Sequence, residues 1–180
     1  TGYFVYSNHT LMAGDAFIPN MVTAPRKTYV IVHPDNISTK GTKNFVIMCG
    51  AIPIPSSVTA YRGFISAINL RIKQKRAIVI YPEAHIWPYY TGIRPFSPVS
   101  FSYPVKCGVP VFASTTTFQK KKIGKTPKVT VYIDGPFYPD TSLSAHEAEK
   151  DLRNRVFTAM TKRSENSTYQ RITYIKTEEK

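Results

Sequence analysis

Acidic side chains are scarce in this chain of 180 residues, in which Asp and Glu number 11 whereas Lys and Arg number 24. The formal net charge at pH 7 is therefore +13, which implies an anionic partner. A nucleic acid, an acidic membrane surface and a phosphorylated substrate all fit this charge. The basic residues gather in two segments, 71–76 and 119–128, which we expect at an exposed helix end and in a loop between strands.

Cysteines and long apolar runs are also scarce, and their scarcity excludes several classes of protein. The two cysteines, Cys49 and Cys107, are too few for a disulfide framework or a zinc site, and they favour a reducing, cytosolic compartment. The sequence has no run of 18 apolar residues and so predicts no membrane-spanning helix. It predicts no signal peptide either. The chain opens on Thr1 in the lead-in to a strand, and we expect a fragment that lacks an N-terminal segment.

The length and the 42% hydrophobic content are those of one globular domain. Runs rich in β-branched and aromatic residues alternate with segments of helical period, which predicts a single α/β domain over 1–180. The continuous apolar run 76–82 is typical of a strand covered on both faces, so we expect a mixed, largely parallel sheet flanked by helices. The predicted strands are 2–6, 28–33, 76–82, 109–115 and 128–135.

Two segments show the apolar period of a helix, and a third helix is predicted to begin near Asp15. In 144–163, Ser144 and Glu147 form a capping box at the start of the helix. The predicted buried positions of that helix are Ala148, Leu152, Val156 and Met160. Those of the helix over 57–73 are Val58, Tyr61, Ile65, Ile68 and Ile72.

Two loops that follow predicted strands carry polar, titratable side chains. His9 and Asp15 follow the strand 2–6, and Glu83 and His85 follow the strand 76–82. Ligand sites in open α/β sheets lie beyond the carboxyl ends of the strands. If the two strands are near one another, we expect both loops to open onto the same cleft.

A histidine paired with an aspartate is suited to proton transfer. The carboxylate fixes the tautomer of the ring, and the other ring nitrogen takes a proton from a substrate hydroxyl. A base positioned in this way contributes ~10²–10⁴-fold to a rate. The spacing of His9 and Asp15 fits such a pair, although a simple surface turn has the same spacing.

Four segments occur in the order, and with similar separations, of the motifs of glycerolipid and lysophospholipid acyltransferases of the PlsC type. These segments are "NHTLMAGD" (8–15), "GAIPI" (50–54), "IYPEAH" (80–85) and "GVPVFA" (108–113). The chain resembles that family over roughly residues 2–135. The resemblance implies that His9 is the general base, that Asp15 orients it, and that Glu83 is a structural or acceptor-site residue. It also implies an acyl-CoA or acyl carrier protein thioester as the acyl donor and a glycerolipid hydroxyl as the acceptor.

The sequence departs from the family pattern at three places. Five residues separate His9 from Asp15, where the family usually has four. Ser56 and Ile86 stand where the family has the two arginines that hold the acceptor phosphate. Arg62, Arg94 and Lys106 are the candidate replacements, since a guanidinium or an ammonium binds phosphate. His85 and the aromatic residues of 86–90 suggest an altered acceptor pocket and an apolar rim that reaches a lipid surface.

The leading hypothesis is therefore an acyltransferase of phospholipid biosynthesis at the cytoplasmic face of a membrane, held peripherally or by a segment outside this chain. It needs no metal and no cofactor beyond the donor thioester, and backbone N–H groups would stabilise the oxyanion. The alternative is an inactive lipid- or acyl-binding module of the same fold, which the missing arginines favour. A nucleic-acid partner is not expected, because the charge is accompanied by no recognised motif. A hydrolase that uses Cys49 or Cys107 is disfavoured because neither lies in a nucleophile elbow.

Overall fold

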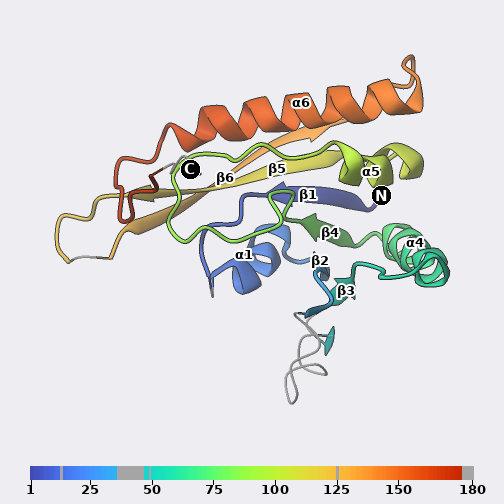
Figure 1. The fold of residues 1–180 in the computed structure, drawn as a ribbon, viewed down its shortest axis with the longest axis horizontal. Coiled ribbons are helices and arrows are strands. Elements are labelled where there is room, and N and C mark those ends of the chain that lie inside the picture. Colours follow the sequence, from blue (N-terminus) through green and yellow to red (C-terminus); the bar gives the residue numbers. More distant parts are fainter. Residues whose placement is uncertain (13, 36–46, 49, 125, 176–180) are drawn as a thin grey trace, which may run out of the picture.

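The computed structural model describes residues 1–12, 14–35, 47–48, 50–124 and 126–175. Six strands form one sheet in the order β3-β2-β4-β1-β5-β6, in which the first five are parallel and β6 is antiparallel to β5 (Figure 1). This arrangement confirms the predicted mixed, largely parallel sheet. The strands are β1 (Tyr3–Ser7), β2 (Thr28–Val32), β3 (Ala51–Pro53), β4 (Ala77–Ile80), β5 (Val111–Gln119) and β6 (Lys128–Phe137).

Helices cover both faces of the sheet. Figure 1 shows α6 along one face and α1 beneath the opposite face. The main core lies on the α6 side, where Phe4 and Tyr6 of β1 join side chains from α4 and α6 in one apolar cluster. The helices are α1 (Gly14–Thr23), α4 (Val58–Lys73), α5 (Ser102–Cys107) and α6 (Ala145–Ser164), and a short 3₁₀ turn, η1 (Val99–Phe101), precedes α5.

The two long helices follow the local signals of the sequence to different extents. In α6, the capping box of Ser144 and Glu147 is present, and all four predicted stripe positions are buried. In α4, Ser57 caps the first turn, and Ile68 and Ile72 are buried with Phe64. The first half of the predicted α4 stripe is wrong, because Val58 is 85% exposed and Tyr61 is also exposed. The period is correct, but the buried positions begin only at Phe64, so the first turn of α4 lies outside the core.

Strand β4 positions the two polar loops. All four of its residues are buried, as the continuous apolar run predicted. It lies beside β1 with Tyr6 opposite Ile80, so the segments that begin at Asn8 and Tyr81 leave the sheet side by side. On the other side of β1, the pairing of Phe4 with Val111 places the start of β5 beside the start of β1.

Strand β5 is longer than the sequence predicted. It continues to Gln119 because Thr115–Gln119 pair with β6 after the pairing with β1 has ended at Ser114. The short helix α5 was not predicted from the sequence. Among the helices of the described residues, none combines the length and the hydropathy of a membrane-spanning segment.

The α6 stripe yields a test of the core. Leu152 is fully buried in α6, whereas Thr158 is exposed on the same helix. We expect Leu152→Ala to lower the free energy of unfolding by about 2–5 kcal/mol, because it leaves a cavity in the core. Thr158→Ala, the control, should change it by less than about 0.5 kcal/mol. Urea unfolding followed by circular dichroism measures both, and equal effects would contradict the packing of α6 on the sheet.

Candidate active site

The loop after β1 is fixed to the sheet before it reaches the histidine. Asn8 is buried, donates from Nδ2 to the carbonyl oxygen of Thr116 at 3.0 Å, and accepts from the Thr116 backbone N–H at 2.8 Å. This pair of bonds continues the β1–β5 ladder through a side chain. His9 therefore leaves the sheet from a rigid point.

His9 and Asp15 form the predicted hydrogen bond. Nδ1 of His9 lies 2.8 Å from Oδ2 of Asp15, whose side chain is buried, while the His9 side chain is 24% exposed. An ionised carboxylate only accepts, so Nδ1 carries the proton and Nε2 has a free lone pair. Within the described residues, no hydrogen bond occupies Nε2. The ring can therefore accept a proton from a molecule at the surface of the domain.

The extra residue between His9 and Asp15 is accommodated in a closed turn. The backbone N–H of Leu11 donates to Oδ2 of Asp15 at 3.0 Å, and the Asp15 N–H donates to the Leu11 carbonyl oxygen at 2.8 Å. The Leu11 side chain packs directly against Gly14, where a Cβ would lie 2.4 Å from Leu11 Cδ2. The five-residue spacing is thus compatible with the dyad geometry.

Tyr81, which directly follows β4, holds the other side of the dyad. Its ring stacks on the His9 ring with centroids 4.5 Å apart, and its hydroxyl donates to the Asp15 backbone carbonyl at 2.6 Å. Burial raises the pKa of the Tyr81 hydroxyl well above its usual value, and the nearby Asp15 charge raises it further. Tyr81 therefore remains a neutral hydrogen-bond donor at physiological pH.

Glu83 joins the two loops through its buried carboxylate. Oε2 accepts from the His9 backbone N–H at 3.1 Å, and Oε1 accepts from the Arg94 backbone N–H at 2.8 Å. The guanidinium of Arg94 adds an ion pair of 3.1 Å to Oε2. None of its described hydrogen bonds is to the ring of His9, and its contacts are those of a positioning residue.

The Arg94 guanidinium makes its contacts with the loop that follows β4. It also donates to the His85 carbonyl oxygen and lies over the Trp87 ring, 4.8 Å from the centroid. Only 13% of the Arg94 side chain is exposed, so little of it is left for an acceptor phosphate. The contacts favour a positioning role for Arg94. The residue His85 is exposed next to Glu83, at the same edge of the sheet as His9.

Neither Arg62 nor Lys106 has a described contact with the dyad. Both are exposed, and none of their described contacts joins them to His9, Asp15 or Glu83. Lys106 lies at the end of α5, which leads into the start of β5, so it is at the amino edge of the sheet, opposite the dyad. Arg62 lies in the first turns of α4.

The segment 86–90 is less open than the sequence predicted. Trp87 stacks on Tyr174 with centroids 4.9 Å apart and meets Tyr90 edge-on, so the C-terminal segment covers part of the expected apolar rim. Met12 and Phe17, which flank Asp15 in the chain, are instead exposed apolar side chains, each 66% exposed.

The described part of the chain offers little support for a metal site or for a cysteine nucleophile. No group of three or more His, Cys, Asp or Glu side chains there is placed to hold a metal ion. Cys107 is a free thiol, and burial raises its pKa, which makes it a poor nucleophile. Cys49 lies outside the described residues.

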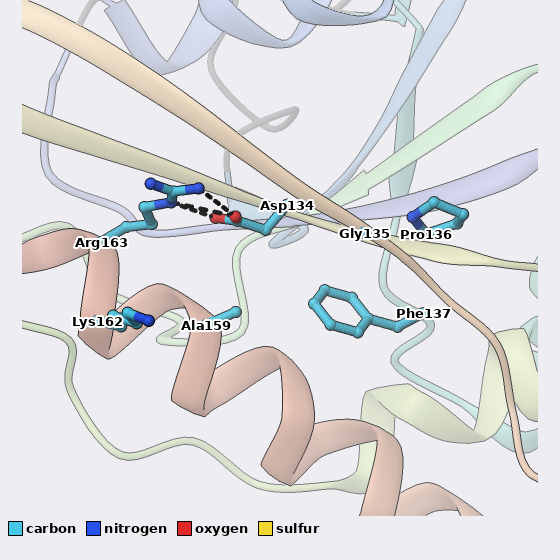
Figure 2. A pocket seen from close by; sticks show the side chains of 7 residues that line it. All are labelled: Asp134, Gly135, Pro136, Phe137, Ala159, Lys162 and Arg163. Atoms are coloured by element: carbon cyan, nitrogen blue, oxygen red, sulfur yellow. Dashed lines mark hydrogen bonds and ion pairs between the residues drawn. The ribbon is translucent and has the colours of Figure 1, made fainter.

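A hollow of about 450 Å³ lies between β6 and α6, away from the dyad. Figure 2 shows Phe137 and Ala159 across it and the Asp134–Arg163 ion pair at one end. That ion pair is bidentate, with its shortest distance 2.7 Å. None of its lining residues belongs to either polar loop, so we place the candidate site at the dyad.

Two positioning residues escaped the sequence analysis. Asn8 is the residue before His9 in the motif, but its bond partner, Thr116, lies 108 positions away. Tyr81 was assigned only to the end of a strand, and its partner Asp15 is 66 positions away. The sequence signal for Asn8 is its place directly before His9, and that for Tyr81 is its place two residues before Glu83.

Comparison with solved structures shows a similar fold in a protein of known structure. The fold is similar to that of the crystal structure of the 1-acyl-sn-glycerophosphate (LPA) acyltransferase, PlsC, from Thermotoga maritima, with a TM-score of 0.63 and 16% identity. The similarity covers 93% of this chain and 68% of that chain. The sequence matches no model of a known protein family and no curated protein. The similarity therefore concerns the fold.

The role of Glu83 can be tested through stability. Glu83→Ala leaves two backbone N–H groups and a mostly buried guanidinium without their acceptor, so we expect a loss of about 3 kcal/mol in the free energy of unfolding. Glu83→Gln keeps one oxygen for the His9 N–H and should lose about 1–2 kcal/mol. The control Glu165→Ala removes an exposed carboxylate and should have almost no effect. Unchanged stability in both Glu83 variants would contradict the positioning role.

Proposed function

We propose that this protein is an acyltransferase that moves an acyl group from a thioester donor to a hydroxyl of a lysophospholipid or another glycerolipid. The observation that supports this most directly is the His9–Asp15 pair, with Nδ1 bonded at 2.8 Å and Nε2 available. The pair lies at the carboxyl edge of the sheet, and the fold is similar to that of an LPA acyltransferase. The donor would be acyl-CoA or acyl carrier protein.

The reaction needs one proton carrier and no acyl-enzyme. Nε2 of His9 takes the proton of the acceptor hydroxyl as its oxygen attacks the thioester carbonyl carbon. The tetrahedral intermediate then collapses, the C–S bond breaks, and the leaving thiolate takes the proton from the imidazolium. Asp15 stabilises the imidazolium between these steps, which is the role of the carboxylate in a His-Asp pair. Glu83, Tyr81 and Asn8 hold the ring and its loop in place.

The observations support the type of reaction more strongly than the identity of the acceptor lipid. Arg94 is engaged with Glu83, and Lys106 is at the opposite edge, so Arg62 and His85 are the remaining candidates among the predicted binding residues. We propose that the protein works at the cytoplasmic face of a membrane, where its lipid acceptor would be found. The alternative, an inactive lipid- or acyl-binding module, is supported by Ser56 and Ile86 in place of the two arginines.

A thiol-release assay tests the reaction. With acyl-CoA or acylated acyl carrier protein as donor and a panel of lysolipids as acceptors, we expect acceptor-dependent release of free thiol. His9→Ala removes the base, and Asp15→Asn removes the carboxylate that sets the tautomer, so each should lower kcat by ~10²–10⁴-fold.

His146→Ala is the matched control, because His146 also lies near a carboxylate, Glu149 at 4.0 Å, but on the exposed surface of α6. It should leave the rate unchanged. Binding of donor and lysolipid without turnover, under all donor and acceptor combinations, would reject the enzyme and favour the binding module.

Arg62 is tested through the acceptor. If its guanidinium binds an acceptor phosphate, Arg62→Ala should raise KM for a lysophosphatidate by about 10–100-fold, the equivalent of one charged hydrogen bond. KM for the uncharged monoacylglycerol and kcat should stay the same. Lys106→Gln, which removes a cation at the amino edge, should change none of these values. An unchanged KM in Arg62→Ala would remove Arg62 from the acceptor site.

A further inference from the structure

The β5–β6 hairpin projects beyond the rest of the sheet on the side of the dyad. Pairing between β1 and β5 ends at Ser7 and Ser114, but β5 continues through Thr115–Gln119 with β6 as its paired strand. At 3.3 Å per residue, these five residues extend roughly 17 Å past the end of β1. Thr115–Phe118 are buried there, so the exposed part of the hairpin begins after Gln119. Figure 1 shows the tip of this arm on the side opposite the N-terminus, where β1 ends.

The tip of this arm combines positive charge with an exposed apolar side chain. Lys120, Lys121 and Lys122 are exposed, and none of them forms an ion pair within the described residues. Ile123 follows them and is 89% exposed. The sequence has no Asp or Glu from 84 to 133. Asp134, the acidic residue of β6, lies far along the strand from the tip and is paired with Arg163, so no acidic side chain of the hairpin offsets the charge of the tip.

The arm is tied to the dyad through its base. The ring of Phe118 lies 5.2 Å from that of Tyr89, and the Tyr89 backbone N–H donates to the Thr10 carbonyl oxygen at 2.8 Å. The backbone N–H of Thr168 also donates to the Phe118 carbonyl oxygen at 2.9 Å, so the segment after α6 supports the base. A surface that binds the tip therefore has a defined position relative to His9.

The other basic segment lies on the opposite side. Lys73 and Lys75 are at the end of α4, which leads into the start of β4, at the amino edge of the sheet. The carboxyl edge instead presents Met12 and Phe17 beside the dyad, together with the arm. Only one of the two basic segments is thus placed to hold the dyad against a surface.

We propose that the hairpin tip, defined as Lys120–Ile123, docks this protein onto an anionic phospholipid bilayer with the carboxyl edge of the sheet facing the lipid. The lysines bind the headgroup layer, and Ile123 inserts between the headgroups. In this orientation a lipid acceptor in the bilayer is presented to His9. The choice of a bilayer rests on the proposed function, but docking itself requires no turnover.

The apolar residue favours a bilayer over an acidic protein. Lysines that flank an exposed Ile can keep their ammonium groups at the headgroups while the Ile side chain enters the acyl boundary. An acidic protein surface would satisfy the charges but would leave Ile123 in contact with polar groups. Charge and apolar exposure together therefore match an anionic lipid surface.

Vesicle cosedimentation compares two triple variants of equal charge. K120Q/K121Q/K122Q and K73Q/K75Q/K106Q each lower the net charge by three, from the arm and from the amino edge respectively. Each lysine near an anionic surface contributes about fivefold in partitioning, so the arm variant should bind phosphatidylglycerol vesicles about 100-fold more weakly. The control variant should bind within about twofold of the wild type. Binding by the wild type should fall as salt rises and should be weak on neutral phosphatidylcholine vesicles.

A second measurement reports insertion of the tip. I123W should add a fluorescence signal that shifts to the blue on phosphatidylglycerol vesicles and is quenched when the acyl chains are brominated. L70W, the control, introduces the same probe at an exposed position of α4, and its added signal should not be quenched.

Several outcomes would overturn the proposal. Equal loss of vesicle binding in both triple variants would show that total charge, and not the arm, is responsible. An unquenched signal from I123W would reject insertion. If the arm variant bound vesicles normally but no longer bound purified acyl carrier protein, the arm would be a protein-docking site. If the arm variant no longer bound vesicles but still released thiol from soluble short-chain substrates, the docking surface would be lost and the proposed function would be unaffected. If the wild type bound vesicles through the arm but released no thiol from any substrate, the proposed function would fail and the docking surface would be unaffected.

Discussion

The carboxylate of Glu83 is the contact on which the candidate site depends. It is buried, and a buried anion is tolerated only where donors replace the water that it has lost. Here those donors are the backbone N–H of His9, the backbone N–H of Arg94 and the Arg94 guanidinium. Because the donors come from both loops, the need to satisfy one charge fixes the loops relative to each other.

The rest of the site is assembled around that bridge. Asn8 fixes the loop before His9, Tyr81 covers one face of the ring, and Asp15 binds its Nδ1. Each of these partners comes from a different part of the sheet edge, so the ring has little freedom to rotate. A general base profits from such restraint, since its free nitrogen is already oriented when a substrate arrives.

The buried negative charges of the site and the exposed positive charges lie in different parts of the molecule and have different roles. The carboxylates of Asp15 and Glu83 both lie buried in the site and are both paired. The excess of positive charge lies instead on exposed segments, at the end of α4 and in the β5–β6 hairpin. Bonding within the site thus orders the loops, while unpaired surface charge remains available for long-range attraction to an anionic partner.

Local signals in the sequence were sufficient for several features of the fold. The capping box of α6 joins residues three positions apart, its stripe repeats every four residues, and the run of four buried residues in β4 is itself local. The closeness of His9 and Asp15 also belongs to this class, because a six-residue separation allows few arrangements. The order of the motifs along the chain indicated the fold that the structure has, a mixed and largely parallel sheet.

Tertiary structure alone decided which residues serve the dyad and which do not. Arg94 was expected to bind phosphate but is held by Glu83, while Lys106 lies at the other edge of the sheet. The partners of Asn8, Tyr81 and Glu83 are 108, 66 and 74 positions away in the chain. The sequence by itself determined periods, caps and the short-range dyad, since these arise from neighbouring residues. Strand order and register determined the rest, because they alone bring distant side chains within hydrogen-bond distance.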